Sequence, residues 1–496
     1  MRALIVAAAL LLWPCAAAGA PSVLEPMARA SLPAPELLKL ASDVRRTGPK
    51  LARLWPGYWP PEQAFILYRP GEGALLIAGQ AGPGTFAPLA AAALPKALRG
   101  RAWFHPGDLT GMGRPFVLDY PIGGGRTAVL VLADQKADAL SGLIFHEQFH
   151  DYQGSAFKGR RGSQFVAPKA VADRVAFAAA AETERRVLAA ALEAKPGRTR
   201  HRLLHQYLAL RRERESGLAA NVLAVERQFE MFEGTAKFID RAAAAFAPGA
   251  EKSLTALVAE VLREDLNAMT QPYLTAWFRT RGYGVGAALT YLLRELDPKG
   301  WRTAIEGGVA LDERLAALTR FDTVRDSAAL ATSARATFGY AATHAAFEPR
   351  IRAAEKKEIK SAEEFHALGV HRVVLEWRPP AKNGGKGVEM GFSTGPGGMV
   401  LLGEAHLVLP DPEMLNMTFP SVSVTVKGLP FMSEGNGTRR YTILLPSAPK
   451  VNGRSGLAAG DHALDRLTVT AGGLEMRVDR AASVVVREGE TIIRVR

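Results

Sequence analysis

Residues 142–154 read GLIFHEQFHDYQG and contain His146, Glu147 and His150. Residues four positions apart lie on one face of an α-helix, so the two histidines can bind one cation together. In a helix of the pattern H-E-x-x-H, zinc lowers the pKa of a bound water to about 7 and the glutamate takes its proton. The stretch therefore predicts a catalytic metal-binding helix. The alternative is an ordinary helix that carries two histidines.

A catalytic zinc site needs a third protein ligand and an open fourth position. The single cysteine, Cys15, lies in the apolar N-terminal segment, and no histidine follows His150 closely. We therefore expect a carboxylate from further along the chain. One segment offers Glu182 and Glu184 in AAAAETERRVL. A second, VERQFEMFEGTAKF, carries three glutamates at a spacing that puts them on one helix face, namely Glu226, Glu230 and Glu233.

The motifs HEQFH and EGTAKF together resemble the gluzincin zinc metallopeptidases, in which H-E-x-x-H is followed by E-G-x-A-x and an aromatic residue. The resemblance covers about residues 100–300. It implies one catalytic Zn²⁺ held by His146, His150 and Glu233, with Glu147 as the general base.

The spacing of the two motifs departs from that of the family, because the segment between them is much longer here. We expect the extra length to form an inserted helical pair, roughly over residues 171–215. The departure leaves Glu182 and Glu184 as alternatives to Glu233 for the third ligand.

Another segment, RTRGYGVGAALTYLLREL, places Arg281 and Tyr283 in an expected glycine-rich turn before an apolar helix. In similar peptidases a downstream tyrosine or arginine stabilises negative charge on the carbonyl oxygen of the substrate. The resemblance implies Tyr283 for this role, with Arg281 behind it, whereas packing of Tyr283 on the helix is the alternative. Asp151 is expected either to accept a hydrogen bond from a ligand histidine or to make a surface contact.

The start of the chain, residues 1–20, has the pattern of a secretory signal peptide. Arg2 precedes the apolar run ALIVAAALLLW, and Ala18 and Ala20 occupy the small-residue positions of a cleavage site. An uncleaved N-terminal anchor is the alternative. The sequence predicts an exported bacterial protein, periplasmic or extracellular, whose mature chain has no disulfide and no transmembrane anchor.

The formal net charge of the 496-residue chain is +13. Its basic residues are scattered, and the densest cluster, HRLLHQYLALRRERE, also contains glutamates. No nucleic-acid-binding motif accompanies this cluster, so the expected partner is a peptide or protein substrate and not a nucleic acid. The oligomeric state is left open.

The order of the segments predicts an α+β chain with more than one core. Residues 21–134 read as the N-terminal α+β part of a catalytic region, and residues 135–345 as its helical zinc-binding part. A helical linker over 346–370 leads to residues 371–496, whose alternating Val, Thr and Gly runs are typical of a β-sandwich module. The predicted fold is therefore a zincin-like region, a small β-sheet with a mostly helical part, followed by an all-β module.

Two local features of the N-terminal part complete the prediction. A helix over residues 34–54 is expected to break near Gly48-Pro49. Apolar runs on both sides of Gly123-Gly124-Gly125 predict a β-hairpin, whose second strand, RTAVLVL, is expected to pair with extended substrate.

Three functions fit these observations. The first is a secreted zinc metallopeptidase, which the intact His-Glu-His set favours. The second is a catalytically weak or inactive zincin-fold binding protein at the cell envelope. The third is a zinc hydrolase of amides that are not part of a protein.

Overall fold

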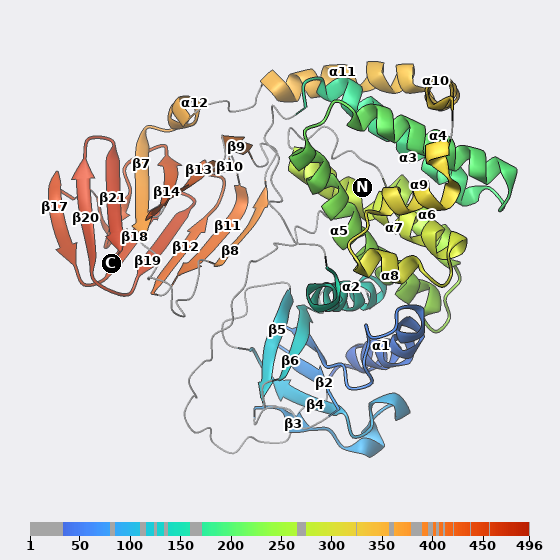
Figure 1. Cartoon of the computed structure of the whole chain (residues 1–496). Coiled ribbons are helices and arrows are strands. Elements are labelled where there is room, and N and C mark those ends of the chain that lie inside the picture. Colours follow the sequence, from blue (N-terminus) through green and yellow to red (C-terminus); the bar gives the residue numbers. More distant parts are fainter. Residues whose placement is uncertain are drawn as a thin grey trace.

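The computed structural model describes the chain except for residues 1–32, 80–84, 110–115, 124–125, 133–136, 159–170, 265–273, 324, 357–361, 378–388, 395–399, 403–405, 410–411, 420, 437, 456 and 496. The described residues form an N-terminal sheet, a helical region and a C-terminal β-rich region, as Figure 1 shows. The α+β prediction is confirmed at this level, whereas the expected signal peptide lies outside the described residues. Over the described part, no helix is both long and apolar enough to cross a membrane.

The N-terminal sheet has the strand order β3-β4-β2-β1-β6-β5. Strand β6 pairs with β1 in parallel and with β5 in antiparallel orientation, so the predicted hairpin is formed. Because both sides of β6 are occupied, the expected pairing of RTAVLVL with substrate is wrong, and the outer strand is β5. The strands are β1 (Phe65–Arg69), β2 (Gly73–Ile77), β3 (Ala87–Pro88), β4 (Ala102–Pro106), β5 (Phe116–Gly123) and β6 (Arg126–Leu132).

Helix α1 (Pro35–Leu54) runs through Pro49 without the expected break. Leu51 and Trp55, which follow the proline, are completely buried, so packing offsets the backbone hydrogen bond that Pro49 cannot make. Gly48 is needed for a close contact, because a Cβ there would lie 2.2 Å from the indole nitrogen of Trp59.

The helical region follows the sheet. Helices α3 and α4 pack on each other and occupy the segment where an inserted helical pair is expected. Helix α11 packs on α3, so the predicted linker over 346–370 begins inside the helical region. The helices are α2 (Ala137–Ala156), α3 (Arg174–Glu193), α4 (Arg198–Glu215), α5 (Ala220–Phe246), α6 (Leu254–Arg263), α7 (Leu274–Leu296), α8 (Trp301–Glu306), α9 (Leu311–Thr319), α10 (Ser327–Thr337), α11 (Tyr340–Lys356) and α12 (Ala362–His366).

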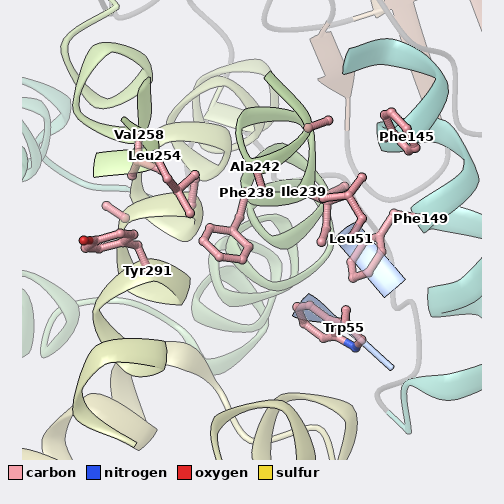
Figure 2. Packing of buried hydrophobic residues seen from close by; sticks show 14 of the residues in the cluster. Leu51, Trp55, Phe145, Phe149, Phe238, Ile239, Ala242, Leu254, Val258 and Tyr291 are labelled. Carbon is pink, nitrogen blue, oxygen red and sulfur yellow. The ribbon is translucent and has the colours of Figure 1, made fainter. Parts of the chain in front are cut away.

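One hydrophobic core joins the sheet to the helices and fixes helix α2 between them. Figure 2 shows Phe149 of α2 beside Leu51 of α1 and close to Trp55, which directly follows that helix; Phe145 of α2 and Phe238 of α5 belong to the same cluster. The Trp55 and Phe149 rings meet edge to face, with their centroids 4.8 Å apart. Aromatic residues on one side of α2 thus anchor the helix and leave its histidines on another side.

Helices α5 and α7 cross with their backbones in direct contact. A Cβ added to Gly286 would lie 2.1 Å from the carbonyl oxygen of Glu230, and one added to Gly234 would lie 2.4 Å from the Cα of Gly286. A Cβ added to Gly282 would lie 2.8 Å from the Cβ of Phe229 on α5. The glycine-rich stretch expected to be a turn is therefore helical, and its glycines allow the two helices to approach closely.

The C-terminal region consists of two sheets whose facing side chains form one buried cluster. The first sheet has the order β17-β20-β21-β7-β14-β13-β10-β9 and the second β16-β15-β18-β19-β12-β11-β8. The strands are β7 (His371–Trp377), β8 (Glu389–Thr394), β9 (Val400–Leu402), β10 (His406–Leu409), β11 (Pro412–Phe419), β12 (Val422–Val426), β13 (Phe431–Asn436), β14 (Thr438–Leu445), β15 (Lys450–Val451), β16 (Arg454–Ser455), β17 (Gly460–Leu464), β18 (Leu467–Ala471), β19 (Leu474–Val478), β20 (Ala482–Arg487) and β21 (Glu490–Val495).

The helix crossing makes a testable prediction about stability. We expect Gly286→Ala to lower the free energy of unfolding by about 3 kcal/mol or more, because the new methyl group meets backbone atoms that cannot move aside. The matched control is Gly154→Ala in α2, where the methyl group meets nothing within 4 Å and should stabilise by up to about 1 kcal/mol. Urea unfolding followed by circular dichroism compares the two, and equal stability would contradict the close crossing.

Candidate metal centre

The structure brings three of the sequence-predicted site residues together, His146 and His150 from α2 and Glu233 from α5. The two Nε2 atoms lie 3.1 Å apart. Glu233 Oε2 lies 3.5 Å from His146 Nε2 and 3.4 Å from His150 Nε2. Within the part of the chain that the structure describes, no other group of three such side chains converges in this way.

The separations of the three ligand atoms fit a zinc ion. Zinc binds histidine nitrogen and carboxylate oxygen at about 2.0–2.1 Å, and tetrahedral geometry then places the ligand atoms about 3.3–3.4 Å apart. The observed separations of 3.1, 3.4 and 3.5 Å lie around this value. Both Glu233 oxygens are buried, and the polar groups next to them are the two histidines, Arg279 and the Tyr283 hydroxyl. A buried carboxylate of this kind is costly unless a cation binds it, so the residues present fit a metal ion.

The charge state of Glu233 also suits a metal ligand. Burial favours the neutral acid, but Arg279 and the two histidines outweigh it, so the pKa of Glu233 lies well below its usual value. The group is therefore a carboxylate at neutral pH, as a metal ligand must be.

Gln153 fixes the orientation of one ligand ring. Its amide nitrogen donates to the Phe232 carbonyl oxygen at 2.8 Å and to Thr235 Oγ1 at 2.7 Å, and Thr235 in turn donates to the Met231 carbonyl oxygen. The amide oxygen of Gln153 must then face His150 Nδ1, 2.7 Å away, and accept its proton. With Nδ1 protonated, the Nε2 of His150 carries a free lone pair directed at the site.

Asp151, expected either to accept a hydrogen bond from a ligand histidine or to make a surface contact, lies on the exposed side of α2. Its side chain is exposed and accepts a hydrogen bond from Gln148 on the same helix. The side chain that accepts a hydrogen bond from His150 is Gln153. It lies on the inner face of α2 because it is three residues after His150.

The two alternative glutamates of α3 lie away from the histidines. Glu182 binds two arginines of its own helix. Glu184 accepts hydrogen bonds from Arg214 of α4 and Arg281 of α7. Arginine side chains already neutralise both carboxylates, so of the glutamates considered from sequence the structure brings Glu233 to the histidine pair.

Arg281, the second candidate after Tyr283 for stabilising charge on the substrate, belongs to a buried ionic cluster. The side chain is 1% exposed. The cluster consists of three arginines and three glutamates from four helices, all of them buried and hydrogen-bonded to opposite charges. In it, Arg281 donates at 2.6–2.8 Å to Glu184, Glu226 and Glu230, which also bind Arg211 and Arg214.

Glu147 is buried beside the centre, with 3% of its surface exposed. Burial raises the pKa of this carboxyl above its ordinary value, and the Glu233 carboxylate adds to the rise, whereas His146 and His150 oppose it. A carboxyl with a raised pKa is suited to accept and release a proton near neutral pH.

Tyr283 lies at the centre together with Arg279, which sequence reasoning missed. The Tyr283 and His146 rings are 5.8 Å apart between centroids. Burial and the Glu233 charge raise the pKa of the Tyr283 hydroxyl, so it stays protonated; it donates a hydrogen bond to Glu233, and Arg279 hydrogen-bonds to it. The two residues are one helical turn apart on α7, and this spacing could have identified Arg279 had the segment been taken as a helix.

Comparison of the chain with family models, with curated proteins and with solved structures finds no match.

The role of Gln153 predicts an effect on metal affinity. We expect Gln153→Leu to weaken zinc binding about 10- to 100-fold, because the His150 ring loses the acceptor that fixes its tautomer. Asp151→Asn, a change on the exposed side of the same helix, should leave the affinity unchanged. Competition with a chromogenic chelator measures both constants, and the opposite ranking would restore Asp151 as the partner of the ligand histidine.

Metal uptake should depend on pH. The Glu233 and Glu147 carboxylates outweigh burial and raise the pKa of His150 above its ordinary value of 6.5. A proton on His150 therefore competes with the metal over a wider range, and zinc affinity should increase as pH rises through that pKa and then level off. Titrations between about pH 5.5 and 8.5 test this expectation, which an affinity independent of pH would contradict.

Proposed function

We propose that this chain is a zinc-dependent metallopeptidase that hydrolyses peptide bonds, with Glu147 as general base. The observation that carries the proposal is the convergence of His146, His150 and Glu233 at separations that suit zinc, with Glu147 buried beside them. The two motifs from which the gluzincin resemblance was drawn lie on α2 and α5, which pack on each other. A zincin-like arrangement of the sheet and helices is part of the same proposal.

A zinc ion in this site would lower the pKa of a water molecule and polarise the carbonyl group of the substrate. Glu147 accepts the proton of the attacking water and passes it to the leaving nitrogen, a transfer that its raised pKa favours. The Tyr283 hydroxyl, protonated because its pKa is raised, donates a hydrogen bond to the carbonyl oxygen as negative charge develops there.

The outer strand β5 is the proposed place for an extended peptide. It lies at the end of the described sheet, and helix α2 follows the β5–β6 hairpin in the chain. A peptide that adds to β5 gains main-chain hydrogen bonds, and its side chains alternate between the two faces. The proposed substrate is therefore a segment of peptide or protein in extended conformation.

Export of the protein to the periplasm or the outside of a bacterial cell is also a proposal. It rests on the pattern of residues 1–20, which lie outside the described residues.

The general-base role is tested with Glu147→Gln. The variant should bind zinc at the wild-type stoichiometry but cleave unfolded casein about 10²- to 10⁴-fold more slowly, because the amide cannot accept a proton. Asp151→Asn makes the same chemical change one turn further along α2 and should retain activity. Wild-type protein that binds zinc without cleaving casein would favour a binding protein or a hydrolase of other amides, and wild-type protein without stoichiometric zinc would overturn the site.

A further inference from the structure

The two oxygens of Glu233 face different partners. Oε2 lies 3.4 and 3.5 Å from the Nε2 atoms of His150 and His146, whereas Oε1 lies 3.4 Å from Nη2 of Arg279. The Glu233 side chain is 2% exposed, so solvent does not reach either oxygen. One oxygen is thus directed at the candidate metal position and the other at a guanidinium group.

Arg279 is the arginine suited to bind Oε1. Its Nη2 is buried and, among the described residues, meets no hydrogen-bond partner of normal geometry. The neighbouring Arg281 cannot replace it, because Arg281 is occupied by three glutamates of the ionic cluster. An ion pair in such a buried place is screened far less than one at the surface.

The position of Arg279 is set by the backbone contact between α5 and α7. Gly234 directly follows Glu233, and it meets Gly286 and Gly282 of α7 at distances that exclude any side chain. Arg279 lies on α7 one turn before Tyr283, whose hydroxyl it binds. The guanidinium therefore approaches Glu233 from a rigid helix and is held there by a second contact.

We propose that Arg279 is a positioning residue that keeps Oε1 of Glu233 away from the metal, so that Glu233 binds through Oε2 alone. The inference rests on the proposed zinc site. Its consequence concerns the number of ligands. A carboxylate that binds through both oxygens would fill two positions, whereas binding through one leaves the fourth position open for the reaction.

The test replaces Arg279 in the full chain and loads each protein with Co²⁺, whose visible absorption is stronger in four-coordinate than in five-coordinate sites. Arg279→Met and Arg279→Gln should lose band intensity, because Oε1 is released to the metal. Arg279→Lys retains a positive charge beside Oε1 and should retain most of the intensity. Arg294→Met, a change near the end of the same helix, should match the wild type.

Hydrolysis of unfolded casein gives the second readout. Both neutral variants should lose about 10- to 100-fold in kcat with little change in KM, because Arg279 acts through Glu233 and Tyr283 and is not itself placed against the bound substrate. A folded neutral variant with the wild-type Co²⁺ spectrum overturns the inference and leaves the proposed function intact. If the neutral variants do not fold, Arg279→Lys decides alone. A Co²⁺ spectrum clearly weaker than that of the wild type in this variant, which keeps the positive charge, would also overturn the inference. Wild-type protein that takes up neither ion refutes the zinc site itself.

Discussion

The contact between α5 and α7 at Gly234, Gly282 and Gly286 is the constraint on which the candidate centre depends. Backbone atoms of the two helices touch there, so neither helix can rotate or slide without a clash. Glu233 is adjacent to this contact on α5, and Arg279 and Tyr283 flank it on α7. The relative positions of these three side chains therefore depend on a contact made mainly by backbone atoms.

The buried ionic cluster complements this contact by joining α5 and α7 to the helical pair α3–α4. Three arginines and three glutamates give it no net formal charge, and their side chains are at most 2% exposed. Desolvation of so many charges is costly, and the mutual hydrogen bonds offset much of that cost. Removal of one member would leave an unpaired buried charge, so each member is needed for the packing of the four helices around it.

The α+β character and the two C-terminal sheets could be anticipated from local periodicity, and the trio of His146, His150 and Glu233 from the motifs HEQFH and EGTAKF, although the spacing of these motifs left other glutamates open. The continuity of α1 through Pro49 could not, since tertiary packing outweighs the local effect of proline. The place of β6 inside the sheet depends on its pairing with β1, which is distant in sequence. Arg279 and Arg281 differ by two positions, and only the crossing at the glycines decides which of them faces Glu233.

The hydrogen-bond chain from His150 through Gln153 to Thr235 connects the two helices that carry the proposed ligands. Its consequence is that contacts between the two helices themselves hold the proposed ligand atoms 3.1–3.5 Å apart, so little rearrangement would oppose the binding of an ion. The fixed spacing of the three proposed ligand atoms also favours some cations over others by size and by the ligands they prefer. Calcium prefers six to eight oxygen ligands at about 2.3–2.6 Å, and magnesium an octahedron of oxygens. Two imidazoles and one carboxylate oxygen, spaced for bonds of about 2 Å, suit a small transition-metal ion better than either of these.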